Sequence, residues 1–370
     1  MSATEWVFDR AVLPEVMQAE VRVSVQDGRI LSVERATGDA GLERKRGTLL
    51  PGLVDLQVNG AGGRSVDEAT PDALDTVADA VWSGGAVAFL PTLITAPWPK
   101  LLQQIRDVVA WCRSWSGRGA EPLGVHVEGP FLTASGAHDR ECMIAPTPAR
   151  VDELLAATDG HPLLITLANA AEGAVDATRR LVAAGAKVAL GHCERADGFA
   201  ACVDAGATAV THLFNAMGQM HHREPGVAAL ALDDERITCP LIVDGVHVSP
   251  AMVRNAFDIL GPHRMVLVTD AVSAAGMPDG RYRLAGMEVT ASGGIVRNAD
   301  GNLAGSALTM TQAARNFLEI VPTAGPWTLS RLASTNPARL IEAASFGALR
   351  PGGRAAFTLL GDDGNLTALR

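Results

Sequence analysis

The chain has 370 residues, of which 48% are hydrophobic and 19% charged, and its 31 basic against 41 acidic residues leave a formal net charge of −10. This apolar content is enough for a sizeable core, which excludes wholesale disorder. The acidic balance argues against nucleic acid or an anionic membrane as a general partner, because both favour a basic surface.

Recognisable targeting signals are absent from the sequence. Residues 1–20 lack the basic start and long apolar run of a secretory signal. No stretch approaches the roughly 18 consecutive apolar residues of a membrane-spanning helix. The five cysteines are odd in number and form no C-x-x-C pair, so we expect reduced thiols in a cytoplasmic protein.

The first fifty residues are predicted to form short strands. Residues 21–33 alternate in polarity around Asp27-Gly28, a dipeptide typical of a two-residue hairpin turn. The pattern changes after Pro51-Gly52, where an apolar run is followed by a helix-like segment that ends in glycine.

This pair of strand and helix then recurs along the chain. Near-continuous apolar runs, typical of parallel strands covered on both faces, occupy eight segments: 53–59, 87–95, 123–129, 163–169, 187–193, 207–214, 239–248 and 264–271. Helical patterns separate them: 71–85, 97–114, 148–158, 172–184, 197–205, 225–235 and 249–260. Eight such units within about 250 residues predict an α/β protein with a (β/α)8 TIM barrel. An open doubly wound sheet is the structural alternative.

The segment after the eighth strand has a different pattern. Residues 281–301 are predicted to form a hairpin, 309–321 and 328–343 helices, and 354–370 strands. We therefore expect two domains: a TIM barrel over residues 51–345, and a small β-sandwich formed by residues 1–50 together with 346–370.

Polar residues stand at the carboxyl ends of the predicted strands, where TIM barrels place their chemistry. They are Gln57, Asn59, His126, Glu128, Asn169, His192, His212, Asn215, Asp244, His247 and Asp270. A lone histidine in a buried strand is more often a hydrogen-bonded core residue than a ligand. A carboxylate inside an apolar strand is rarely buried without a partner, which singles out Glu128 and Asp270. Histidines combined with one glutamate form a typical set of ligands for a divalent metal.

An ordered set of short motifs resembles one known family. PGLVDLQVNG (51–60) is similar to the metal-site strand of the amidohydrolase superfamily, although Gln57-Val58-Asn59 replaces its usual His-x-His. The set continues with HVEGPF, GHC, THLFNAM, REPG, DGVHV, VTDA and LAGS, and the match runs from about residue 50 to 340. Together these motifs resemble the N-acetylglucosamine-6-phosphate deacetylases. The resemblance implies metal-dependent removal of acetate from N-acetyl-D-glucosamine 6-phosphate, in amino-sugar catabolism and cell-wall recycling.

The resemblance also implies a metal site. Glu128, His192 and His212 match the metal ligands of the family. Amide oxygens are poorer partners for zinc than imidazole, so the Gln57 and Asn59 replacement implies one divalent metal rather than two. Zinc is the metal we expect, with iron, cobalt and manganese left open. Gln57 and Asn59 are then expected beside the metal, with Gln57 orienting the attacking water.

Two residues match catalytic positions of the family. Asp270 matches the general base and acid, which takes a proton from water and passes it to the departing amine. His138, in the loop after Glu128, matches a histidine that polarises the amide oxygen. The alternative interpretations are a structural carboxylate for Asp270 and a solvent-exposed side chain for His138.

Further residues match the substrate contacts of the family: Ala137, Asn215, Ala216, Arg223, His247, Leu303, Ala304 and Gly305. Asn215, Ala216 and Arg223 are implied to face the phosphate, and a guanidinium suits bidentate phosphate binding. In relatives this arginine reaches in from the neighbouring subunit, so the resemblance implies a homodimer. His247 resembles a residue that contacts the sugar hydroxyls or the phosphate, and residues 303–305 resemble a backbone segment that lines the sugar site.

Other functions remain open at this stage. The protein could be another amidohydrolase, acting on cyclic amides or on a different N-acetyl sugar phosphate such as the galactosamine epimer. The lysine that bridges two metals in many cyclic-amide enzymes has no candidate in LLITLAN (163–169). A catalytically inactive barrel that binds sugar phosphates is an alternative from another class, and the presence of Asp270 with all three metal ligands argues against it.

Overall fold

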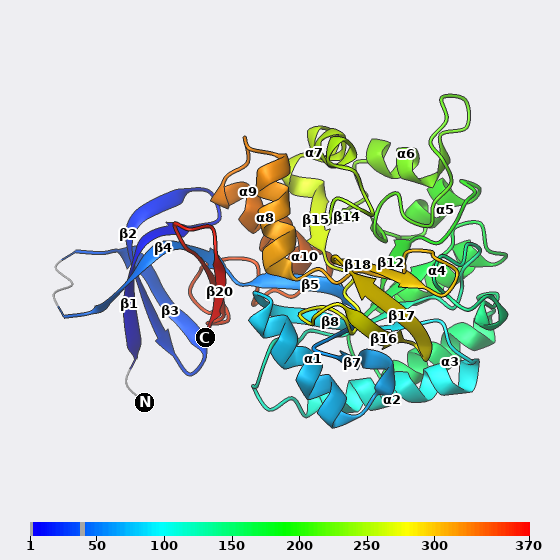
Figure 1. The fold of residues 1–370 in the computed structure, drawn as a ribbon, viewed down its shortest axis with the longest axis horizontal. Helices are drawn as coiled ribbons and strands as arrows, with labels where there is room; N and C mark the ends of the chain where they lie inside the picture. The colour runs from blue at the N-terminus through cyan, green and yellow to red at the C-terminus, as the bar shows by residue number, and fades with distance from the viewer. Residues whose placement is uncertain (1–2, 38–40) are drawn as a thin grey trace.

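The computed structural model describes residues 3–37 and 41–370. The amino-terminal segment forms four strands: β1 (Thr4–Val12), β2 (Met17–Gln26), β3 (Arg29–Arg35) and β4 (Glu43–Pro51). They join β19 (Phe357–Leu360) and β20 (Leu366–Leu369) in one six-stranded sheet, in the order β20-β19-β4-β1-β2-β3. This sheet, on the left of Figure 1, therefore combines strands from both ends of the described chain.

The hairpin predicted around Asp27-Gly28 is confirmed. Strands β2 and β3 pair antiparallel, and both turn residues adopt positive φ angles, 49° and 71°. Turns of this kind match the twist of the flanking strands, which explains the preference for Asp-Gly. The sheet has a hydrophobic cluster of its own, formed by Phe8, Ala11, Val21, Val23, Ile30, Leu49, Leu349, Ala355 and Phe357.

The centre of the molecule is a curled parallel sheet. Six of its strands lie in the order β13-β12-β11-β10-β8-β5: β5 (Leu53–Val58), β8 (Ala86–Ile94), β10 (Val125–Glu128), β11 (Leu163–Leu167), β12 (Lys187–Leu190) and β13 (Ala209–Val210). A further parallel pair consists of β14 (Cys239–Ile242) and β15 (Met265–Val268). Parallel bridges Ala209↔Thr238 and Val58↔Ala271 link the pair to β13 and to β5. The eight strands thus follow one another around the sheet, as in a TIM-type barrel.

Helices alternate with these strands and cover the outside of the curled sheet: α1 (Pro71–Ser83), α2 (Trp98–Arg113), α3 (Pro148–Thr158), α4 (Ala174–Ala183), α5 (Phe199–Asp204), α6 (Gly226–Asp233) and α7 (Pro250–Arg264). Several begin at a capping hydroxyl followed by proline. Thr70, Thr147 and Ser249 each accept a hydrogen bond from a backbone N–H of the first turn. A proline in the first turn lacks only an N–H that would have no partner within the helix. In α7 the helical conformation is interrupted at Gly261.

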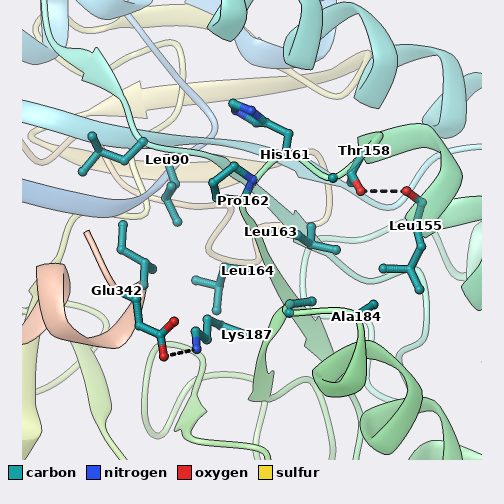
Figure 2. Close-up of a pocket in the computed structure, with 15 residues that line it drawn as sticks. Leu90, Leu155, Thr158, His161, Pro162, Leu163, Leu164, Ala184, Lys187 and Glu342 are labelled. Atoms are coloured by element: carbon teal, nitrogen blue, oxygen red, sulfur yellow. Dashed lines mark hydrogen bonds and ion pairs between the residues drawn. The ribbon is translucent and has the colours of Figure 1, made fainter. Parts of the chain in front are cut away.

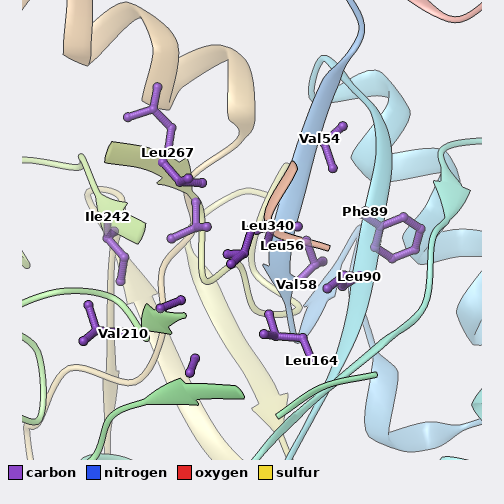
Figure 3. Close-up of a cluster of buried hydrophobic side chains, with 14 of the residues drawn as sticks. Val54, Leu56, Val58, Phe89, Leu90, Leu164, Val210, Ile242, Leu267 and Leu340 are labelled. Carbon is purple, nitrogen blue, oxygen red and sulfur yellow. The ribbon is translucent and has the colours of Figure 1, made fainter. Parts of the chain in front are cut away.

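Apolar side chains fill the space inside and around the sheet. Val54, Leu56 and Val58 of β5 belong to one large hydrophobic cluster that also includes Ile242 of β14 and Leu267 of β15 (Figure 3). All six residues of β5 and all nine of β8 are buried, which explains why these strands are almost continuously hydrophobic in the sequence.

Several predicted boundaries were too long. The sixth strand, expected at 207–214, is only Ala209–Val210, and the seventh, expected at 239–248, is only Cys239–Ile242. His212 leaves the extended conformation with φ 28°, and Asp244 folds the chain back by accepting hydrogen bonds from the backbone of Val246 and His247. Both strands therefore end early, because polar residues at their ends take the backbone out of the regular hydrogen-bonding pattern of the sheet.

The segment after β15 completes the barrel. Strands β16 (Gly280–Leu284), β17 (Met287–Ser292) and β18 (Ile295–Asn298) form a three-stranded antiparallel sheet where one hairpin was predicted. Helix α8 (Met310–Ile320) follows as expected. The single helix predicted at 328–343 is instead α9 (Pro326–Ser330), a π-helical turn (Arg331–Thr335) and α10 (Asn336–Leu340). Pro337 lacks the N–H that a continuous α-helix needs at that point.

The remaining elements are short: β6 (Gly60–Ala61), β7 (Arg64–Ser65), β9 (Glu121–Pro122) and 3-10 turns at Val66–Glu68 and Arg140–Cys142. No helix in the described part of the chain is long and apolar enough to cross a membrane. A cavity of about 460 Å³ lies at the amino ends of β11 and β12, lined by His161, Leu163 and the ion pair of Lys187 with Glu342 (Figure 2). The polar residues singled out in the sequence lie at the other end of these strands.

Candidate active site

A second pocket, of about 140 Å³, opens at the carboxyl ends of the parallel strands. Most residues picked from the sequence line it: Asn59, Glu128, Ala137, His138, His192, His212, Asn215, Ala216, His247, Asp270, Leu303 and Gly305. Segments far apart in the sequence therefore converge on one place, because the carboxyl ends of parallel strands meet at one end of a barrel.

Glu128, His192 and His212 meet at the bottom of this pocket. Glu128 Oε1 lies 3.0 Å from His192 Nε2 and 2.9 Å from His212 Nε2, and the two histidine nitrogens are 3.2 Å apart. All three side chains are almost fully buried. Glu128 comes from the end of β10, whereas the histidines follow β12 and β13 in the left-handed conformation, with φ 49° and 28°. This backbone conformation turns both imidazoles towards the carboxylate.

The protonation of the cluster follows from its contacts. His192 Nδ1 lies 2.9 Å from the backbone oxygen of Ala134, so Nδ1 carries a proton and Nε2 presents a lone pair to the pocket. Burial, together with the nearby charge of His138, lowers the pKa of His192. For His212 burial acts the same way, but hydrogen bonding to Glu128 outweighs it and raises the pKa to about 9. Burial opposes ionisation of Glu128 too, yet its close contacts with the imidazoles of His138, His192 and His212 hold its pKa well below the usual range.

His138 is the third of these histidines. Its Nε2 lies 3.6 Å from Glu128 Oε2, and its Nδ1 lies 2.6 Å from the hydroxyl of Thr95. The side chain is buried, so the alternative interpretation of a solvent-exposed loop residue is wrong. Ligand atoms of Glu128, His138 and His192 all lie within 4.8 Å of one another, which is close enough for a shared metal ion.

Asp270 faces this cluster from the segment after β15. Its Oδ1 accepts hydrogen bonds from Gln57 Nε2 (3.0 Å) and Asn59 Nδ2 (2.7 Å). Burial, assisted by the negative charge of Glu128, raises the pKa of Asp270 to about 6. The sequence predicts Gln57 and Asn59 near the metal, but no local pattern in it indicates this contact with Asp270. It arises because the sheet closes between β5 and β15.

His247 and Asn215 also line the pocket. His247 Nδ1 lies 2.6 Å from Asp244 Oδ2, which orients the ring. Burial opposes the negative charge on Asp244, but hydrogen bonding to His247 lowers its pKa. Asn215 Nδ2 donates to the backbone oxygens of His212 and Leu213, at 3.3 Å each, and the following Ala216 has a left-handed backbone. These contacts hold the turn after His212 in shape.

Two predicted substrate residues do not line this pocket. Ala304 is fully buried, and its backbone N–H donates to Val296 in β18, so it supports the neighbouring Leu303 and Gly305 from behind. Arg223 lies in an exposed loop, where its guanidinium is 2.9 Å from His222 Nε2. Within this chain it is therefore separate from the cluster around Glu128.

The structure adds lining residues that the sequence analysis missed. Ile94, Ile242 and Leu284 form apolar parts of the pocket wall. Ile94 and Ile242 end their strands, so their place in the barrel pattern could have revealed them. Leu284 belongs to the β16–β18 sheet, and no local signal in the sequence connects that sheet with the pocket.

The donor set fits a divalent metal. One carboxylate oxygen and two imidazole nitrogens converge within 3.2 Å of one another in a buried site, and one imidazole already has the required tautomer. Glutamate with two histidines is a common set of ligands for zinc and for neighbouring transition metals. Asn59 Oδ1 is buried and, in the described part of the chain, has no hydrogen-bond partner. It is therefore available to accept a hydrogen bond from a water or a substrate.

Comparison with known proteins agrees with this geometry. Residues 48–369 match the amidohydrolase family model, so the chain belongs to the amidohydrolase family. An N-acetylgalactosamine-6-phosphate deacetylase of Escherichia coli O157:H7 is 37% identical over 343 residues, which cover 92% of this chain and 90% of that protein. The human N-acetylglucosamine-6-phosphate deacetylase is 36% identical over 362 residues, or 91% and 87% of the two chains.

Solved structures extend this similarity to the fold. N-acetyl-D-glucosamine-6-phosphate deacetylase from Mycobacterium smegmatis, in complex with N-acetyl-D-glucosamine 6-phosphate, superposes with a TM-score of 0.93 at 33% identity, covering 100% of this chain and 98% of that chain. The deacetylase from Thermotoga maritima gives a TM-score of 0.86 at 28% identity, covering 98% and 96%.

Proposed function

We propose that the protein hydrolyses the acetamide of N-acetyl-D-glucosamine 6-phosphate to D-glucosamine 6-phosphate and acetate. The observation that carries the proposal is the convergence of Glu128, His138, His192, His212 and Asp270 on one buried pocket. The relatives named above, which act on N-acetylated amino-sugar phosphates, support it. An inactive sugar-phosphate-binding barrel would not need a carboxylate with a raised pKa beside a set of metal ligands.

The cofactor in this proposal is one divalent metal per subunit, most simply zinc, held by Glu128, His192 and His212. These residues have the shortest mutual distances in the cluster, whereas His138 lies further from Glu128. A bound divalent metal supplies a Lewis acid and makes hydroxide available from water at neutral pH. Gln57 and Asn59 replace the His-x-His pair and use their amide nitrogens on Asp270, which leaves no imidazole for a second metal.

Asp270 serves as the general base and then the general acid. Gln57 and Asn59 both donate to its Oδ1, so they fix the carboxylate and leave Oδ2 for the proton of the attacking water. A pKa of about 6 lets Asp270 accept this proton near neutral pH and return it to the departing amine.

His138 polarises the amide oxygen of the substrate. The backbone N–H of Thr95 lies 3.4 Å from His138 Nδ1, and the Thr95 hydroxyl lies 2.6 Å away, so Nδ1 can accept from Thr95. This leaves the ring proton on Nε2, which faces Glu128 across the pocket. An N–H donor at this place would stabilise the negative charge that develops on the acyl oxygen.

The phosphate is bound by Asn215, Ala216 and Arg223, with His247 near the sugar, and residues 303–305 and Ala137 line the sugar site. Arg223 lies outside the pocket of its own chain, so this proposal includes a homodimer in which it completes the neighbouring site. The five cysteines are free thiols, which fits a cytoplasmic location.

We also propose the domain division expected from the sequence, with residues 1–50 and 346–370 as a small β domain and 51–345 as the catalytic barrel. The separate hydrophobic cluster of the six-stranded sheet supports it. We propose that the small β domain, residues 1–50 and 346–370, is a β-sandwich.

Acetate release from a panel of N-acetylhexosamines, each with and without a 6-phosphate, tests the function. We expect turnover of N-acetylglucosamine 6-phosphate well above that of the unphosphorylated sugar. The galactosamine epimer is the second candidate, because the Escherichia coli relative is named for it. Absence of acetate release from every phosphorylated sugar would refute the proposal.

Metal content tests the cofactor. Protein purified without chelator should contain about one tightly bound divalent metal per chain, because one carboxylate and two imidazoles form a single set of ligands. Elemental analysis measures this directly. Two tightly bound metals per chain would contradict the role given to Gln57 and Asn59.

A further inference from the structure

A chain of buried polar side chains crosses the interior of the barrel beneath the active site. It consists of Thr92 on β8, His126 on β10, Thr166 on β11 and Thr211 after β13, all at most 3% exposed. His126 Nδ1 lies 3.3 Å from the Thr92 hydroxyl, and its Nε2 lies 2.9 Å from the Thr166 hydroxyl. Thr166 and Thr211 are hydrogen-bonded to each other at 2.7 Å. We call these four residues the polar belt.

The last bond of the polar belt passes over a strand. Strand β12 lies between β11 and β13, so a side chain on β12 would ordinarily separate Thr166 from Thr211. The residue at this place is Gly191, and a Cβ built on it would lie 2.9 Å from Thr211 Cβ and 3.2 Å from Thr166 Cγ2. A Cβ at these distances would force the two threonine side chains to shift, so glycine allows the two hydroxyls to meet as they do.

Three members of the belt, and Gly191 beside it, adjoin residues of the active site. His126 precedes Glu128 by two positions on the same strand, so both side chains point into the barrel. Thr211 directly precedes His212, and Gly191 directly precedes His192. Thr92 accepts a hydrogen bond from the backbone N–H of Val58, which lies between Gln57 and Asn59, at 2.9 Å. The belt therefore ties together the strands that present Glu128 and His212, and it passes over Gly191, the residue before His192.

The belt has no evident part in the chemistry itself. Both ring nitrogens of His126 are occupied by threonine hydroxyls, and threonine hydroxyls are poor acids and bases. Apolar side chains fill most of the neighbouring interior and would pack here without any need for matched donors and acceptors. The hydrogen bonds of the polar belt, which apolar side chains could not form, restrict how the strands can shift against each other.

We infer that the polar belt is a positioning device that holds Glu128, His192 and His212 at the relative heights required for one divalent metal. This inference rests on the proposed metal site and adds residues to it. Hydrogen-bonded partners behind metal ligands typically contribute 10- to 100-fold to metal affinity. The polar belt acts less directly than such partners. Its residues act through the backbone of the strands that carry these ligands.

Thr166 offers the sharpest test, because valine has nearly the same shape and lacks only the hydroxyl. In Thr166→Val the bonds to His126 and Thr211 are both lost, whereas Thr166→Ser retains the hydroxyl and is the matched control. We expect zinc to dissociate from Thr166→Val about 10-fold faster than from wild type when excess chelator is added. Thr166→Ser should release zinc at close to the wild-type rate. The thermal midpoint of each metal-free protein reports whether the fold is intact.

Equal rates for wild type and Thr166→Val would overturn the inference, as would equally fast release from Thr166→Ser, since packing rather than hydrogen bonding would then be responsible. If Thr166→Val does not fold, Thr211→Val breaks the same threonine pair from the other side, with Thr211→Ser as its control. A wild-type protein that binds no zinc, cobalt or manganese would instead refute the metal site of the proposed function. The two failures are therefore distinguishable.

Discussion

The pKa of each carboxylate in the active site depends on the groups that surround its oxygen atoms. Asp270 and Glu128 are both buried carboxylates in one pocket, yet their pKa values move in opposite directions. Burial raises that of Asp270 to about 6, because only two amides donate to it. Three histidines overcome burial at Glu128 and lower its pKa. The pocket thus contains one carboxylate suited to hold a cation and one suited to accept a proton.

Asp270→Asn should retain the metal and lose turnover by about 10²- to 10⁴-fold, the usual contribution of general acid–base catalysis. The side chain keeps its shape but can no longer accept the proton of the attacking water. Steady-state acetate release and elemental analysis of the same sample measure the two properties. Asp258→Asn, on the exposed face of α7, is the control. A fully active Asp270→Asn enzyme would show that Asp270 is a structural carboxylate.

Asp55, beneath the site, provides a prediction on stability. Its Oδ2 accepts from the Thr269 hydroxyl at 2.6 Å, and its Oδ1 accepts from the backbone of Gln57 and Thr269. Burial raises the pKa of Asp55 from 3.8 to about 7, because these hydrogen bonds offset it only in part. The folded state therefore holds this proton more tightly than the unfolded state, and the stability it contributes is lost as pH rises from about 4 to about 7.

Replacement by asparagine removes this titration. The difference in free energy of unfolding between wild type and Asp55→Asn should therefore shift against the wild type as pH rises from about 4 to about 7. Urea unfolding of the metal-free proteins at several pH values measures it. A difference that stays constant over this range would mean that Asp55 does not titrate there.

At the scale of elements, the loops after the strands carry most of the site. Residues 219–225, which lead into α6, are all exposed, and this loop projects from the molecule (Figure 1). It carries Arg223, a cation with no carboxylate partner among its described contacts. A guanidinium placed in this way is suited to reach an anionic group outside its own chain.

Arg223→Ala should reduce kcat/KM for the phosphorylated sugar by about 10-fold or more, because a charge-assisted bidentate contact contributes roughly 1.5–3 kcal/mol. Turnover of free N-acetylglucosamine should change little. Kinetics with both substrates measure the ratio, and Arg236→Ala, whose guanidinium bonds Asp204 and Asp234, is a control on another loop. An equal loss on both sugars would make Arg223 a structural residue.

At the scale of the whole molecule, a net charge of −10 opposes an anionic substrate. Salt screens such a field within about 8–10 Å, so the groups within a few ångströms of the phosphate decide its binding. In the proposed function these groups come from two chains, and the oligomer is then part of the site.

Mixing two impaired variants tests this arrangement. Arg223→Ala keeps Asp270, and Asp270→Asn keeps Arg223, so a mixed dimer contains one complete site if the arginine crosses to its neighbour. After subunit exchange at equal amounts, about a quarter of the sites should regain activity with the phosphorylated sugar. Sedimentation of each variant shows whether dimers form. Activity no greater than that of the separate variants would mean that Arg223 does not complete the partner's site.

Local pattern was sufficient for the sequence to predict the alternating strands and helices, the hairpin at Asp27-Gly28 and the polar residues at strand ends. Burial on both faces makes a parallel strand apolar, and turn geometry selects Asp-Gly, so both features can be recognised within a few residues. The bonds that shape the site are not local. Gln57 and Asp270 are 213 positions apart and meet only because β5 and β15 close the sheet.

The same reason explains the other surprises. His138 is buried because its ring contacts the hydroxyl of Thr95, which lies 43 positions earlier at the end of β8. Thr166 and Thr211 meet only across Gly191, the residue that follows the strand between them. Register and closure determine such contacts, and neither is encoded in the spacing of apolar residues along one segment. The sequence by itself therefore determined which elements and which reactive residues this protein has, whereas the tertiary structure decided which of those residues touch.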